Sequence, residues 1–241
     1  MTSIPADTKL VELSRLAGGL AHEIRNPLST LNLNLQLLEE DLNHPQPDGD
    51  SVRRCRERIG VLRHEVQRLS DILDDFLRFA RMPKPHKIPC DVNGIVAEIL
   101  RFIGPEARRN NVNILTSCGN LPLCMVDKDL LKQALLNVLL NAEQAMAEGG
   151  DVMVRTTVEG DDIRISIADT GHGIAPEVRA RIFEPYYSTK KQGTGLGLSL
   201  VKRVAEEHGG RIQVHSGGRK GACFDIILPV AQFAAEKSQT S

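Results

Sequence analysis

A histidine followed directly by a carboxylate is the residue pair best suited to chemistry in this sequence. His22 and Glu23 stand together in Leu20-Ala-His-Glu-Ile-Arg-Asn-Pro-Leu28. Adjacent side chains on a helix point about 100° apart, so the two cannot both face a core. A carboxylate beside an imidazole can orient the ring, hold one tautomer and accept its proton, which would make His22 a nucleophile. The alternative is that both are ordinary solvated residues on a helix surface.

Two glycine-rich stretches are candidates for a nucleotide site. Asp169-Thr-Gly-His-Gly173 follows an expected strand, where Gly171 and Gly173 would let the backbone pass close to a ligand. Asp169 could accept a hydrogen bond from an exocyclic amine. Gly193-Thr-Gly-Leu-Gly197 stands immediately before a helical pattern, so its N–H groups could face phosphate. Each stretch is also compatible with an ordinary turn, and the second matches neither the P-loop nor the Rossmann spacing.

A pair of asparagines could complete such a site. Asn137 and Asn141 lie one turn apart on one face of an expected helix. Their carboxamide oxygens could ligate Mg²⁺ and approach phosphates without adding negative charge, although buried, hydrogen-bonded asparagines are the alternative. The segment Arg181–Lys191, between the two glycine stretches, brings cations near the expected phosphate site.

The elements that must position His22 form a predicted helical hairpin. Apolar residues recur in steps of three and four, stop at a turn-forming stretch (43–49) and then resume. A hairpin of two such helices cannot bury its apolar face alone, so dimerisation into a four-helix bundle is expected. The first stripe comprises Leu13, Leu16, Leu20, Ile24, Leu28, Leu31, Leu35, Leu38 and Leu42. The second comprises Ile59, Leu62, Val66, Leu69, Leu73, Phe76 and Ala80.

Two local features of this hairpin bear on its function. Pro27 lacks an N–H and is expected to kink the first helix just after His22, although a tolerated proline is an equal alternative. A basic cluster opens the second helix, where a solvated face is favoured over partner docking. The basic cluster comprises Arg53, Arg54, Arg56 and Arg58.

The rest of the chain predicts a two-layer α/β sandwich, so that the fold class is α+β. The prolines of Arg81-Met-Pro-Lys-Pro-His86 indicate a linker. Helices are expected at 95–103, about 129–146 and 199–207. Strands are expected at 112–115, 152–158, 163–168, 211–215 and 223–228, with a hairpin turn at 159–162. Strands backed by about three helices favour the sandwich.

Composition narrows the function classes. The chain has 241 residues, 41% hydrophobic and 25% charged, as in ordinary soluble globular proteins. A net charge of −1 and 3% aromatic residues give no reason to expect nucleic-acid or membrane-surface binding. No apolar run approaches the roughly 18 residues of a membrane span and no signal peptide is evident, so a cytoplasmic location is expected. The five scattered cysteines favour reduced thiols over disulfides or zinc; they are Cys55, Cys90, Cys118, Cys124 and Cys223.

Taken together and in this order, these stretches resemble a sensor histidine kinase. Residues 22–28 are similar to the H box, 137–141 to the N box, 169–173 to the G1 box, 183–187 to the F box and 193–197 to the G2 box. The resemblance runs from about Leu13 to Leu228, and the sequence around His22 is most similar to the nitrogen-regulation-type branch. Gln144, where many relatives carry lysine, and Tyr186-Tyr187, where a Phe pair is commoner, depart from the pattern.

The resemblance implies a HisKA-type dimerisation and phosphotransfer hairpin (8–82), a linker (83–88), a HATPase_c catalytic domain with a Bergerat-type ATP-binding fold (89–230) and a disordered tail (231–241). By the same resemblance, His22 would attack the γ-phosphate of ATP, Glu23 would accept its proton and Asn26 would orient water to dephosphorylate the partner. Asn141 would ligate Mg²⁺ with Asn137 beside it, while Asp169 would read the adenine amine. The remaining implied ATP-binding residues are Gly171, Gly173, Lys190 (with Lys191 as second choice), Gly193, Thr194, Gly195, Leu196 and Gly197.

The implied function is that of a homodimeric two-component kinase core, which passes phosphate from its histidine to an aspartate on a response regulator receiver domain. Related superfamily ATPases carry a glutamate base where Asn137 stands, so transfer to histidine is favoured over hydrolysis. Two alternatives stay open: an ATPase or serine kinase of the same superfamily, and a non-catalytic scaffold that binds nucleotide and a partner.

Overall fold

The computed structural model describes residues 6–43, 49–190, 193–216 and 221–230, and in its first helix describes side chains from residue 17 onward. By their contacts these residues form two units. The first combines the chain up to Met82 with the segment Glu184–Leu196, called the lid segment below. The second comprises Pro83–Phe183 and the chain from Gly197 onward. The predicted tail, Lys191 and residues 44–48 of the predicted turn lie outside the described residues.

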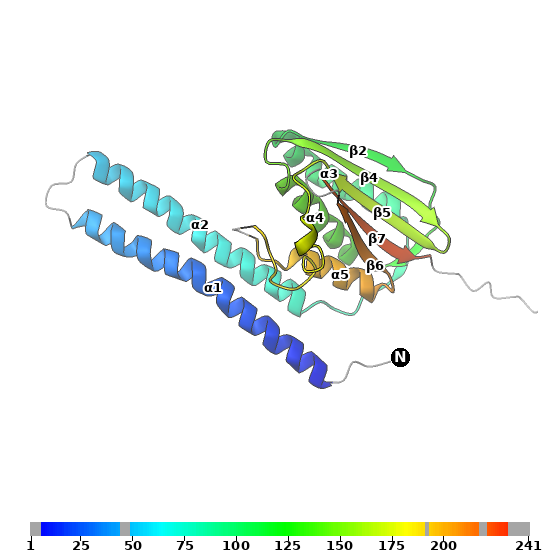
Figure 1. Cartoon of the computed structure of the whole chain (residues 1–241), viewed down its shortest axis with the longest axis horizontal. Helices are drawn as coiled ribbons and strands as arrows, with labels where there is room; N and C mark the ends of the chain where they lie inside the picture. Colours follow the sequence, from blue (N-terminus) through cyan, green and yellow to red (C-terminus); the bar gives the residue numbers. More distant parts are fainter. Residues whose placement is uncertain (1–5, 44–48, 191–192, 217–220, 231–241) are drawn as a thin grey trace, which may run out of the picture. The chain divides into compact units, whose positions relative to one another are not determined.

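The first unit contains the predicted helical hairpin, which is confirmed. Helix α1 spans Ala6–Leu42 and α2 spans Gly49–Ala80 (Figure 1). Pro27 lies buried inside α1, which is helical on both sides of it. Because proline has no N–H, the backbone carbonyl of Glu23 lacks the donor that position 27 would otherwise supply. The turn that carries His22 is therefore one backbone hydrogen bond short.

Two arginines of the basic cluster join α2 to α1. Arg58 Nε donates to Asp41 Oδ2 at 2.7 Å, and Arg54 Nε donates to Asp41 Oδ1 at 3.3 Å. The hydrogen bond from Arg58 lowers the pKa of the Asp41 carboxyl group, which favours its ionised form. Arg53 instead pairs within its own helix, with Asp50 and Glu57. The predicted solvated face therefore describes only part of this cluster.

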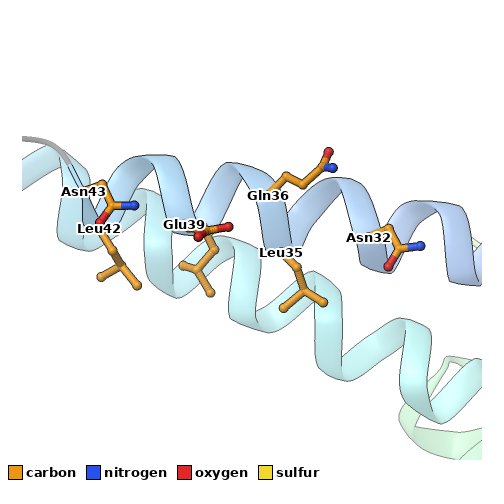
Figure 2. A pocket seen from close by; sticks show the side chains of 7 residues that line it. Asn32, Leu35, Gln36, Glu39, Leu42 and Asn43 are labelled. Carbon is orange, nitrogen blue, oxygen red and sulfur yellow. The ribbon is translucent and has the colours of Figure 1, made fainter.

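Part of the predicted apolar stripe remains uncovered. Leu35 and Leu42 are 52% and 70% exposed, and Leu28 on α1 and Val66 on α2 are also exposed. Leu35, Leu38 and Leu42 line a groove of about 590 Å³ together with polar residues of the same helix. In Figure 2, Leu35 and Leu42 project from the same side of α1 and Gln36 from the opposite side. Exposed apolar side chains gathered on one side of a helix are candidates for contact with a partner.

The second unit is the predicted two-layer α/β sandwich. Its main sheet has the strand order β2-β4-β5-β7-β6, in which β2 and β4 are parallel and the other neighbours antiparallel. The strands are β2 (Val112–Cys118), β4 (Gly150–Glu159), β5 (Asp162–Asp169), β6 (Arg211–Ser216) and β7 (Ala222–Pro229). Helices α3 (Val92–Arg109), α4 (Lys128–Gln144) and α5 (Gly197–Glu207) cover one face of the sheet (Figure 1).

Strand alternation sets the direction of the first site residue. On β5, Ile163, Ile165 and Ile167 are buried, and the residues between them are not. Side chains two positions apart in a strand point to the same face. Asp169 continues this phase, so its carboxylate points to the covered side of the sheet. The fold thus places a carboxylate at the end of an apolar row.

The β4–β5 hairpin is confirmed, with Glu159 opposite Asp162. Helix α3 is longer than predicted. Asp91 caps its start, accepting from the Asn93 N–H at 3.0 Å, and the helix continues past Pro105.

Two short strands, β1 (Ile88–Cys90) and β3 (Cys124–Val126), form a separate antiparallel pair that the sequence analysis missed. Three residues are too few to show an alternating pattern. Ile88, the last residue of the predicted linker, is the first residue of β1. A short 3₁₀ helix (Pro176–Val178) follows the glycine-rich stretch 169–173.

Candidate nucleotide site and phosphoacceptor helix

Asp169, in the second unit, has a carboxylate that backbone N–H groups hold in place. It ends β5 and is only 9% exposed. Its Oδ1 accepts hydrogen bonds from the backbone N–H groups of Gly171, at 2.8 Å, and Ala222, at 3.3 Å. These two donors fix the carboxylate in one orientation.

Two positions in the loop after Asp169 favour glycine. A Cβ on Gly171 would lie 2.5 Å from the carbonyl oxygen of Ala145, at the end of α4. Gly173 is buried and has a φ of 73°, a backbone conformation that side chains rarely tolerate. The His172 N–H also donates to the Ala145 oxygen, at 3.3 Å. The glycines therefore let this loop lie directly against α4, the helix that carries both asparagines.

Gly221 belongs to this site but was missed in the sequence analysis. Its φ is 65°, its N–H donates to the carbonyl of Gly171 at 2.8 Å, and a Cβ there would overlap the carbonyl oxygen of Asp169. The available signal was a glycine two residues before the predicted strand at 223–228. A single glycine before a strand is too common to identify a site without the structure.

Asn137 and Asn141 converge on the start of α5. Both are half-buried on α4. A Cβ on Gly197, the first residue of α5, would lie 3.6 Å from Asn137 Oδ1 and 4.0 Å from Asn141 Nδ2. The first N–H groups of a helix have no partner within it and carry its positive dipole end. Two carboxamides and a helix N-terminus therefore meet at one place, which suits phosphate groups.

This donor set fits one kind of magnesium binding. Among the described residues, no group of three or more His, Cys, Asp or Glu side chains could hold a metal ion. Mg²⁺ is commonly held by one or two protein oxygens together with water and substrate phosphates. The Asn141 carboxamide fits that arrangement, whereas a metal site built by the protein alone does not fit these residues.

The other predicted ATP-binding residues belong to the first unit. Lys190, Gly193, Thr194, Gly195 and Leu196 lie in the lid segment, whereas Asn137, Asn141, Asp169, Gly171, Gly173 and Gly197 lie in the second unit.

Within the lid segment, the glycines have structural reasons of their own. Gly195 has a φ of 67° and accepts from the Tyr186 N–H at 3.1 Å. Gly193 donates to the Lys190 carbonyl at 3.4 Å, and a Cβ there would lie 2.6 Å from Ser188 Oγ. Thr194 Oγ1 donates to Asp75 Oδ2 of α2 at 2.8 Å. The structure therefore shows Thr194 engaged with the hairpin, a contact that the sequence analysis did not foresee.

His22, Glu23 and Asn26 all lie on α1. His22 and Asn26 are exposed and Glu23 is half-buried. Among the described residues, no hydrogen bond joins the imidazole to the carboxylate. His22 and Asn26 are four residues apart and so lie on the same face of the helix. The exposed imidazole is open to an incoming reactant, with a carboxylate next to it in the sequence and a carboxamide one turn away.

Known proteins match both halves of this arrangement. Residues 12–85 match the family described as "His Kinase A (phospho-acceptor) domain", and residues 126–232 match "Histidine kinase-, DNA gyrase B-, and HSP90-like ATPase". Sensor histidine kinase ZraS of Escherichia coli (strain K12) is 36% identical over 223 residues, which cover 92% of this chain and 46% of ZraS. The chain spans about half the length of ZraS and of the other curated ZraS proteins that it matches.

Solved structures agree. The mycobacterial sensor histidine kinase MprB is 30% identical with a TM-score of 0.53, over 60% of this chain and 97% of that one. The crystal structure of histidine kinase ThkA with response regulator protein TrrA gives a TM-score of 0.76 over 93% of this chain and 64% of that one; at 23% identity it supports the fold. Among the described residues, no helix is both long and apolar enough to cross a membrane. With a phosphoacceptor family and an ATPase family matched in this order, the chain belongs to the sensor histidine kinases.

Proposed function

We propose that this chain is the kinase core of a two-component system, which phosphorylates His22 from Mg-ATP and passes the phosphoryl group to an aspartate of a response regulator. The observation that carries the proposal is an exposed imidazole on a helical hairpin, followed in the same chain by a buried, doubly hydrogen-bonded Asp169 in an ATPase-type sandwich. The hairpin supplies the acceptor, and the sandwich supplies the donor.

In the first step an imidazole nitrogen of His22 forms a bond to the γ-phosphorus. The bond from that phosphorus to the bridging oxygen breaks, and ADP leaves with the electron pair. Glu23 takes the imidazole N–H proton, because its position next to His22 puts it within reach of a rotated ring. In the second step a carboxylate oxygen of the receiver aspartate attacks the same phosphorus and the N–P bond breaks. The imidazole leaves with that electron pair and regains a proton from Glu23 or water, which restores the neutral histidine.

The ATP contacts are assigned by chain position and by the contacts described above. Asp169 accepts from the adenine amine, and Asn141, with Asn137 beside it, binds Mg²⁺ and phosphate through its carboxamide. The neutral side chain of Asn137 cannot act as a general base for water, which favours transfer to histidine over hydrolysis. The other contacts come from Gly171, Gly173, Lys190, Gly193, Thr194, Gly195, Leu196 and Gly197.

Two partners follow from this function. A second copy of the chain would cover the exposed stripe around Leu35, Leu42 and Val66, giving a four-helix bundle. A receiver domain would dock where His22 is exposed. ThkA, whose fold this chain shares, was crystallised with the response regulator protein TrrA.

Both ATP and such regulators are cytoplasmic, so we place this core in the cytoplasm. We also propose the domain bounds 8–82 and 89–230 with a linker at 83–88, membership of the nitrogen-regulation-type branch, and a phosphatase role for Asn26.

Incubation of the purified chain with γ-labelled ATP tests the proposal. The protein should acquire acid-labile, base-stable label, and His22→Gln should abolish it. His64→Gln, at another exposed histidine of the hairpin, is the matched control and should keep it. Phosphate release without protein label would instead indicate an ATPase, and neither label nor release would indicate a scaffold.

A further inference from the structure

The ring of Tyr186, in the lid segment, packs against α1 at Gly19. A Cβ on Gly19 would overlap the Tyr186 ring, whereas a Cβ on the neighbouring Gly18 would have nothing within 4 Å. Gly19 lies three residues before His22 and four before Glu23, so all three share one side of the helix. The ring can therefore reach the turn that carries His22 only because residue 19 is glycine.

The backbone of the lid segment holds Tyr186 in this position. Tyr186 has a φ of 62°, which is rare for a residue with a side chain. A Cβ on Gly195 would lie 2.5 Å from the carbonyl carbon of Tyr186, so this glycine allows the close approach. The Tyr186 hydroxyl is buried with no hydrogen-bond partner among the described residues. Burial, aided by the nearby charge of Glu23, raises the pKa of Tyr186 to about 12.

A second contact fastens the lid segment to α2. Thr194 Oγ1 donates to Asp75 Oδ2 at 2.8 Å. Asp75 is half-buried, and burial raises the pKa of its carboxyl group despite the hydrogen bond from Thr194. A threonine hydroxyl has one proton to donate. While Thr194 donates that proton to Asp75, it cannot donate it to a phosphate oxygen.

We propose that Gly19 and Asp75 are positioning residues that seat the lid segment on the hairpin, and that this seat competes with nucleotide. The inference rests on the proposed ATP binding by the lid segment. A polyphosphate must take the Thr194 hydroxyl from Asp75, whose carboxylate would repel it at short range. The seated form is thus the resting form of the kinase. The measured affinity for ATP is the intrinsic affinity multiplied by the fraction of molecules outside the seated form.

Gly19→Ala tests the seat, with Gly18→Ala as the matched control. Both substitutions raise helix propensity equally, but only Gly19→Ala places a methyl group in the Tyr186 ring. In the ATP-free full chain, Gly19→Ala should speed hydrogen exchange across the lid segment and tighten ATP binding by about three- to tenfold. Gly18→Ala should change neither. Equal behaviour of the two variants would overturn the proposal.

Substitutions at Asp75 test the second contact independently. Asp75→Ala removes the acceptor and should tighten ATP binding, whereas Asp75→Asn keeps an oxygen that can accept from Thr194 and should restore part of the seat. Asp74→Ala, at the exposed neighbour, is the control. If neither the wild-type chain nor any variant binds ATP, the proposed function fails. Hydrogen exchange still decides, in that case, whether the lid segment is seated on the hairpin. Unchanged exchange and affinity in Asp75→Ala would contradict the seat alone.

Discussion

Single residues in this molecule owe their chemistry to what surrounds them. Asp169 is an ordinary carboxylate until strand alternation turns it inward and two backbone N–H groups fix one of its oxygens. His22 shows the opposite arrangement, because it is exposed and no hydrogen bond among the described residues holds its ring. This difference suits the roles proposed for the two residues: a recognition group benefits from being fixed, whereas an acceptor that would meet both ATP and a receiver aspartate has to stay accessible.

Asp169→Asn should weaken ATP binding while leaving the fold intact. The carboxamide oxygen can still accept from Gly171 and Ala222, but its amino group would face the adenine amine, donor against donor. Loss of a hydrogen bond to a charged group costs about 1.5–3 kcal/mol, or roughly ten- to a hundredfold in Kd. Titration calorimetry with ATP measures the loss, and circular dichroism checks the fold.

Asp161→Asn provides the comparison for that measurement. Asp161 is exposed in the β4–β5 turn, so the same chemical change there should leave the ATP affinity at the wild-type value. An Asp169→Asn variant that binds ATP as tightly as wild type would remove Asp169 from the adenine site.

At the scale of elements, ion pairs join the two helices of the hairpin, while part of its apolar stripe stays exposed. Asp41 joins the end of α1 to Arg54 and Arg58 on α2. Leu35 and Leu42 nevertheless remain half or more exposed. A pair of helices can bury only the sides that face each other, so a stripe wider than that contact requires a further helix pair.

Leu35→Lys should therefore dissociate the dimer. Burying one leucine is worth about 1.5–3 kcal/mol, and a two-fold interface loses it twice, so the dimer Kd should rise by about a hundredfold or more. Sedimentation equilibrium measures that constant. Leu115→Lys, at an exposed leucine of β2, should leave the dimer unchanged; equal effects of both substitutions would argue against the α1 groove as the interface.

The elements also show why some features could be predicted from the sequence and others could not. Long periodic segments such as α1 and the β4–β5 hairpin were predicted correctly, because many residues report one pattern. The β1–β3 pair was missed, since three-residue strands carry no period. The Thr194–Asp75 contact joins residues 119 positions apart, and nothing local to either residue signals it. Gly19 was likewise unremarkable until the ring of Tyr186 was seen against it.

At the scale of the whole molecule, the hairpin and the lid segment belong to one unit and the α/β sandwich belongs to the other. Removal of phosphate from a receiver domain needs an oriented water but no ATP chemistry. Asn26 lies one turn after His22 on the same exposed face, so its carboxamide can hold such a water beside a docked receiver aspartate. A substitution on α1 should therefore be able to remove the phosphatase activity while leaving autophosphorylation of His22 in place.

Asn26→Ala should slow dephosphorylation of a phosphorylated receiver domain by about tenfold or more, since positioning of a reactant accounts for barrier differences of this size. Labelling of His22 from ATP should continue, because Asn26 takes no part in the attack on the γ-phosphorus. The assay follows loss of label from a receiver domain that the wild-type chain has phosphorylated, after ATP is removed. Ser29→Ala, at an exposed serine whose hydroxyl donates to the Arg25 carbonyl of its own helix, should dephosphorylate at the wild-type rate. If Asn26→Ala matched that rate, the carboxamide would have no role in the reaction, and loss of labelling in the same variant would instead place Asn26 in the kinase step.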